Sequence, residues 1–136
     1  MNPQDNAALA DFLHQMPAGA PQEAALRGAC GRAYYFAFVI VRDFLISAKF
    51  NVPTRGAHQK TIDFLQRSDD KEVLLAASLF KQLRDKREDA DYAVGSRTNT
   101  IFGELDSKRA LEIAHRVVEK ITNAAKADPR MKISLI

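Results

Sequence analysis

The sequence predicts an all-α protein: a four-helix, up-and-down bundle with a short extra helix at its N-terminus. Helix-length segments alternate with three clusters of Gly, Pro, Asn, Ser and Thr, at residues 16–21, 49–58 and 93–106, which predict loops. Apolar residues recur between these loops at the spacing of amphipathic helices. The only strand-like alternation is MKISLI at residues 131–136, and we expect residues 128–136 to form a flexible tail.

The composition fits one soluble domain over residues 1–136, with a core at about residues 21–127. A chain of 136 residues with 46% hydrophobic and 27% charged residues can build one core. No apolar run reaches the ~20 residues of a membrane span, and the N-terminus lacks a basic signal region. The single cysteine, Cys30, excludes an intrachain disulfide, and we expect it to be buried. We therefore expect a cytoplasmic protein without membrane association.

The charge balance leaves nucleic-acid binding open without favouring it. The net charge is +3 and the pI is about 9.1, which is compatible with nucleic-acid binding. The densest charged run, RDKREDAD at residues 84–91, holds three basic and four acidic residues. A surface that follows a phosphate backbone is not usually built in this way.

The first two predicted helices differ in how much of their surface is apolar. The first should cover about residues 7–15, with Leu9, Phe12 and Leu13 facing inward. The second should run over about residues 21–49. From residue 33 to 45 its apolar side chains cover nearly the whole circumference, which indicates a helix surrounded by neighbours. We expect this helix to be central, and its excess apolar surface to form a homodimer contact.

Three further helices follow. The third should cover about residues 55–67 with Thr54 as its N-cap, and the fourth about residues 70–92. The fifth should begin after Asp106, another candidate N-cap, and end before Asp128. Its inward stripe is predicted to consist of Leu111, Ala114, Val118, Ile121 and Ala125.

A polar cluster is predicted where the central helix begins its most apolar segment. A buried tyrosine needs a hydrogen-bond partner, so Tyr34 or Tyr35 must meet a polar group. The inward stripe of the fourth helix turns charged at Arg84 and Arg87, so it either enters solvent with local ion pairs or lines a polar pocket. His58 lies on the buried face of the third helix, as a satisfied core histidine or as an acid or base. The candidate binding residues are Tyr34, Tyr35, His58, Arg84, Arg87, Asp91 and Tyr92.

Three segments, GRAYYFAF at residues 31–38, GAH at 56–58 and LFKQLRDKREDADY at 79–92, together resemble the small stand-alone HEPN domain proteins of bacteria and archaea. Gly31 stands where that family usually has serine. The resemblance implies an α-helical bundle, commonly dimeric, linked to RNA or nucleotides. Many members are metal-independent ribonucleases, and many are toxins paired with minimal nucleotidyltransferases.

The resemblance also implies where catalytic residues would stand. Catalytic members carry an arginine followed by four to six residues and a histidine, but the expected histidine position holds Ala90. Arg109 and His115 have a fitting separation, although such a pair is common by chance and points to different sides of a helix. The catalytic candidates are Arg87, His58, Arg109 and His115.

Three functions follow as hypotheses. The first is a HEPN-type dimer acting as an RNA- or nucleotide-associated binding or accessory module of a toxin–antitoxin or defence system, with a nucleotidyltransferase-like antitoxin as possible partner. The second is a metal-independent ribonuclease toxin, in which Arg87 neutralises phosphate and His58 is the acid or base. The third is a purely structural assembly module. His14, His58 and His115 lack metal-ligand spacing, so we expect no metal and no cofactor.

Overall fold

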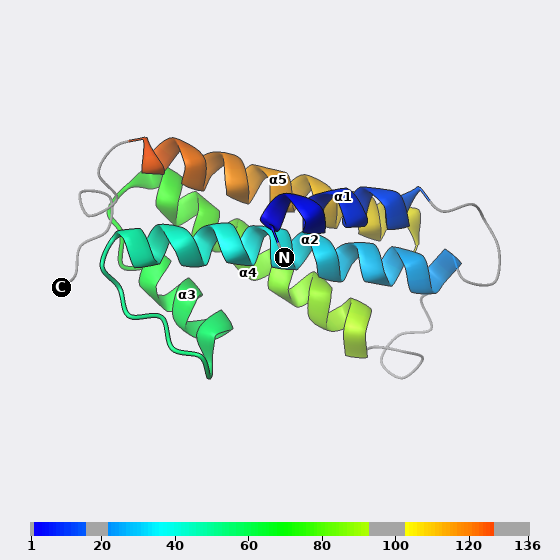
Figure 1. Cartoon of the computed structure of the whole chain (residues 1–136), viewed down its shortest axis with the longest axis horizontal. Helices are drawn as coiled ribbons and strands as arrows, with labels where there is room; N and C mark the ends of the chain where they lie inside the picture. Colours follow the sequence, from blue (N-terminus) through cyan, green and yellow to red (C-terminus); the bar gives the residue numbers. More distant parts are fainter. Residues whose placement is uncertain (1, 16–21, 93–102, 127–136) are drawn as a thin grey trace.

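A computed structural model describes residues 2–15, 22–92 and 103–126, without the side chains of residues 91 and 92. Within these ranges the chain forms five α-helices and no strand, which confirms the all-α bundle. Consecutive long helices run in alternating directions, and the short α3 lies beside the C-terminal half of α2 (Figure 1). The helices are α1 (Pro3–His14), α2 (Gln22–Ser47), α3 (Ala57–Leu65), α4 (Lys71–Tyr92) and α5 (Glu104–Ala125).

The central position of α2 is confirmed. It contacts all four other helices, and buried residues occur along its length from Ala25 to Leu45. Cys30 is fully buried, as expected. Only part of the helix surface remains open, where Tyr35 and Ile46 are 36% and 51% exposed. The all-round apolar segment is therefore largely explained by neighbours within one chain.

α1 packs on α2 through small side chains. Ala7 and Ala10 are buried in the common core, whereas Phe12 is 65% exposed, so the prediction that Phe12 faces inward is wrong. The two helices approach closely at Gly28, where an added Cβ would lie 3.3 Å from Cδ1 of Leu13. α1 therefore turns its alanine face to the core, and Phe12 lies on the opposite face.

The starts of α3 and α5 differ from the predicted N-caps. α3 begins after Gly56, which adopts the left-handed conformation (φ 69°), and no side chain caps the helix. This backbone conformation favours glycine, and the N-cap lies two residues after Thr54. Asp106 lies inside the first turn of α5, where its carboxylate accepts a 2.9 Å hydrogen bond from the N–H of Gly103. Both N-cap predictions are wrong, although both helices are present.

The buried stripe of α5 shifts by one position in its second half. Val118 is only partly buried and Ala125 is exposed, so the prediction of an inward Ala125 is wrong. From Leu111 onward the steps along the observed stripe are three, three, four and three residues, because the helix keeps its 3.6-residue period. The buried apolar residues are Ala110, Leu111, Ala114, Val117, Ile121 and Ala124.

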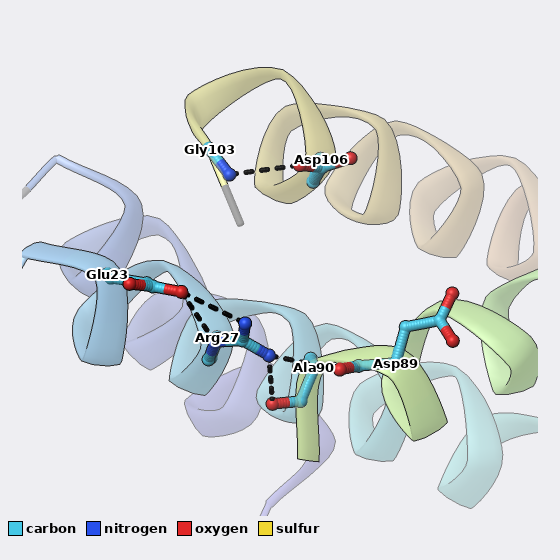
Figure 2. A network of polar contacts seen from close by, with 6 residues as sticks. All are labelled: Glu23, Arg27, Asp89, Ala90, Gly103 and Asp106. Carbon is cyan, nitrogen blue, oxygen red and sulfur yellow. Dashed lines mark hydrogen bonds and ion pairs between the residues drawn. The ribbon is translucent and has the colours of Figure 1, made fainter. Parts of the chain in front are cut away.

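Arg27 connects the first part of α2 to the end of α4 (Figure 2). Its Nη1 donates hydrogen bonds to the carbonyl oxygens of Asp89 (3.0 Å) and Ala90 (2.9 Å). Its Nη2 lies 2.9 Å from a carboxylate oxygen of Glu23. The last carbonyls of a helix lack donors within the helix and carry its negative dipole end, so a guanidinium there is favourable. This link fixes the C-terminal turn of α4 against α2.

Replacing Arg27 should destabilise the bundle. Arg27→Met removes the donors for two carbonyls of α4, and we expect the free energy of unfolding to fall by about 1–3 kcal/mol. Arg32→Met on the same helix is the control, since Arg32 is exposed, and should change stability by less than about 0.5 kcal/mol. Urea unfolding followed by circular dichroism measures both. Equal effects of the two substitutions would contradict the role of Arg27.

Candidate functional site

Tyr34 is the centre of the polar cluster. It is fully buried, and its ring stacks on that of Phe80 in α4, with centroids 5.3 Å apart and planes 8° from parallel. Its hydroxyl is hydrogen-bonded to Nδ1 of His58 at 2.5 Å. The expected polar partner of a tyrosine is therefore His58. Tyr34 of α2 therefore contacts α3 through His58 and α4 through Phe80.

Two arginines of α4 lie next to this tyrosine. The Cζ atom of Arg87 is 5.2 Å from the ring centroid of Tyr34 and 5.3 Å from that of Tyr35, which is cation–π geometry. Arg84, three residues earlier, donates a hydrogen bond to Gln59, the neighbour of His58. The Nε of Arg84 lies 4.0 Å from a carboxylate oxygen of Glu88, which is more exposed. Two guanidinium groups thus flank the tyrosine–histidine pair.

Burial and the arginines determine the charge states in the cluster. The pKa of His58 is lowered, first by desolvation and then by the positive charges of Arg87 and Arg84. Burial raises the pKa of Tyr34, although Arg87 and Arg84 oppose this shift. Near neutral pH the cluster therefore presents two guanidinium groups beside a neutral imidazole and a neutral phenol.

Phe38 and Arg42 of α2 extend the cluster and were missed in the sequence analysis. The ring of Phe38 has its centroid 4.4 Å from that of His58. The Cζ of Arg42 is 6.0 Å from the Phe38 centroid, and one Nη lies 3.5 Å from the carboxylate of Asp43. The steps from Tyr35 to Phe38 and from Phe38 to Arg42 are three and four residues. This spacing could have indicated that the three residues share one helix face.

Five of the seven predicted binding residues come together, and two of the catalytic candidates lie elsewhere. Asp91 and Tyr92 end α4, but their side chains lie outside the described part of the chain. Arg109 and His115 are exposed on α5, about 120° apart around the helix axis. His115 packs its ring edge against Phe36. The residues that meet are Tyr34, Tyr35, His58, Arg84 and Arg87.

The described residues offer neither a metal centre nor a membrane span. Across residues 2–15, 22–92 and 103–126, no three His, Cys, Asp or Glu side chains gather as metal ligands would. None of the helices described there is long and apolar enough to pass through a bilayer. No family model, curated protein or solved structure matches the chain. The resemblance to HEPN proteins therefore remains a prediction.

The cluster has the chemistry of an anion site with an aromatic neighbour. Guanidinium groups donate several hydrogen bonds in one plane and suit phosphate oxygens. The partly exposed ring of Tyr35 lies beside Arg87 and can accept a stacked base. His58 already shares Nδ1 with Tyr34, so only its Nε2 is left for another partner.

The lowered pKa of His58 should make stability depend on pH. Below about pH 6.5 the imidazole of the unfolded chain binds a proton that the folded protein resists, so the free energy of unfolding falls as the pH falls. The unfolding midpoint in urea, compared at about pH 7.5 and about pH 5.5, measures this loss. The loss of stability between these two pH values should be smaller in His58→Gln than in the wild type.

His115→Gln is the control for this measurement, because His115 is exposed on α5 and lies outside the cluster. We expect it to keep the wild-type loss of stability. If His58→Gln loses as much stability as the wild type between the two pH values, His58 is not held neutral by the fold.

Proposed function

We propose that the protein is a HEPN-like helical homodimer that acts as an RNA-binding accessory module. The observation that carries the proposal is the position of Arg87 across the rings of Tyr34 and Tyr35, with Arg84 close by. This arrangement holds positive charge next to a partly exposed aromatic ring. Single-stranded RNA presents the complementary pair of groups, a phosphate and an unpaired base.

The proposed binding is modest and sensitive to salt. Arginines that contact phosphates release counterions from the nucleic acid, so the affinity falls as the salt concentration rises. The carboxylate of Glu88 next to Arg84 reduces the positive potential of the surface. A small patch of this kind fits an accessory role better than tight binding along a long RNA.

The arrangement favours binding over cleavage. Metal-independent cleavage needs groups that move protons at the ribose, and His58 offers only Nε2 for this because its Nδ1 is hydrogen-bonded to Tyr34. Ala90, at the position where the HEPN pattern has its histidine, is buried and its carbonyl is bound by Arg27. Arg109 and His115 lie apart from the arginine–tyrosine cluster on α5. A ribonuclease toxin is therefore the alternative to be tested, and a nucleotidyltransferase-like partner is proposed on the resemblance alone.

RNA binding is tested with a fluorescently labelled single-stranded RNA and the purified protein in EDTA. We expect fluorescence anisotropy to report binding and Arg87→Ala to weaken it at least about tenfold, which corresponds to about 1.4 kcal/mol. Arg116→Ala, an exposed arginine of α5, should bind as the wild type does. Circular dichroism verifies that both variants are folded.

The same samples, run on a gel, decide between binding and cleavage. Intact RNA after incubation supports the accessory module. Cleavage that is lost in His58→Ala or His115→Ala would establish the ribonuclease instead. An affinity that is undetectable, or equal in the wild type and Arg87→Ala, would overturn the proposed RNA site.

The proposed homodimer uses the open face of α2. Val39 and Ile46 are seven residues apart, so they lie on one side of the helix, C-terminal to the ring of Tyr35 that the RNA site uses. Ile46 is exposed, and Val39 is only partly buried. A second copy of the chain packed on this stripe would cover the apolar surface that the bundle leaves open.

A charge on this stripe should separate the subunits. We expect light scattering at micromolar concentration to give the mass of a dimer for the wild type and of a monomer for Ile46→Arg. Leu105→Arg places the same charge on another exposed leucine, on α5, and should remain dimeric. A monomeric wild type, or equal behaviour of both variants, would exclude this dimer face.

A further inference from the structure

We propose that an anion bound beside Arg84 and Arg87 draws a proton from solvent onto His58, so that RNA binding and protonation of this imidazole are coupled. The inference rests on the proposed RNA site and adds a regulatory property to it. Binding then becomes tighter as the pH falls below neutral. The reasoning starts from how His58 is held.

The ring of His58 is held in the cluster by three side chains of α2. Tyr34 provides the hydrogen bond to Nδ1, and the rings of Phe38 and Tyr35 lie 4.4 and 6.3 Å away by their centroids. The backbone of His58 is held as well, since its carbonyl oxygen accepts a 2.8 Å hydrogen bond from the hydroxyl of Thr61 in the next turn of α3. These contacts keep the imidazole in the cluster, where the arginines act on its charge.

The charged groups around His58 are mainly positive. From α4, Arg84 and Arg87 act on it directly, and Glu88 is paired with Arg84. From α2 come the neutral Tyr34 and Tyr35, and Arg42 lies beyond the ring of Phe38. The side chain of Asp91 is outside the described part of the chain. In the free protein this environment, together with burial, keeps His58 uncharged.

A bound phosphate reverses this balance. Its negative charge offsets the two guanidinium groups that disfavour the imidazolium, and it attracts the new positive charge as well. Coupling between the two events is reciprocal, because a ligand that stabilises the protonated imidazole must itself bind more tightly once the imidazole is protonated. The pKa of His58 therefore rises when the anion binds.

The hydrogen bond between Tyr34 and His58 can persist through the change. The hydroxyl donates to Nδ1 of a neutral imidazole, and the phenol oxygen accepts from Nδ1–H of the imidazolium. Protonation therefore reverses the direction of this bond without breaking it. Tyr34 acts as a positioning residue that keeps the ring in place in both states.

Proton uptake is measured by titrating the protein with oligouridylate that lacks terminal phosphates, since its groups do not titrate near neutral pH. Isothermal calorimetry at about pH 6.5, in two buffers of different ionisation enthalpy, gives the number of protons bound with the RNA. We expect uptake of a fraction of one proton by the wild type and by His115→Gln. We expect none in His58→Gln, which should still bind the RNA.

The second measurement uses the wild-type fold and does not depend on a His58 variant. Proton NMR follows the three histidine rings of the chain during a pH titration, and His14→Gln and His115→Gln identify the signal of His58 by elimination. We expect the His58 midpoint to move to higher pH when oligouridylate is present. Tyr34→Phe should reduce the shift, since the ring of His58 is then no longer held in place beside the arginines.

The outcomes separate this inference from the function on which it rests. Absence of RNA binding at every pH overturns both. Binding without proton uptake, or uptake that persists in His58→Gln, overturns the coupling and leaves the RNA site intact. A His58 midpoint that is the same with and without RNA also overturns the coupling.

Discussion

The burial of Tyr34 is the constraint on which the rest of the cluster depends. Its aromatic ring is part of the core against Phe80, yet its hydroxyl cannot be left without a partner. His58 supplies that partner and brings α3 to the bundle. The partly buried Arg87 places its guanidinium group over the same ring. One tyrosine therefore positions both a neutral imidazole and a guanidinium group, and a defect in its packing would disturb stability and binding together.

Much of the fold and part of the cluster follow from spacing in the sequence. Helical periodicity depends on residues close in sequence, so it predicted the five helices and the central position of α2. The need of a buried tyrosine for a partner, and the stripe of α4 that turns charged, predicted that Tyr34, His58 and Arg87 meet. These arguments require only that each side chain faces the right way on its own helix.

The features that sequence reasoning missed depend on how helices sit against each other. Phe12 was assigned to the core because it is large and apolar, but α1 packs through the face that carries Ala7 and Ala10. Arg27 was not singled out, because its role is to bind carbonyl groups of another helix. Those carbonyl groups lie 62 and 63 residues further along the chain. Phe38 meets His58 only through the particular approach of α3 to α2, and Arg42 lies on the ring of Phe38. Whether the cluster binds anything is a question of chemistry that spacing alone does not answer.

α3 has a consequence for the order in which the chain folds. It is nine residues long and starts without a side-chain cap, and an isolated helix of this length is not stable in water. Its helical state depends on the docking of Ile62 and Leu65 in the core and on the bond from His58 to Tyr34. Those partners exist only after α2 and α4 have packed. We therefore expect α3 to form only as it docks on α2 and α4, which would make the cluster one of the last regions of the protein to assemble.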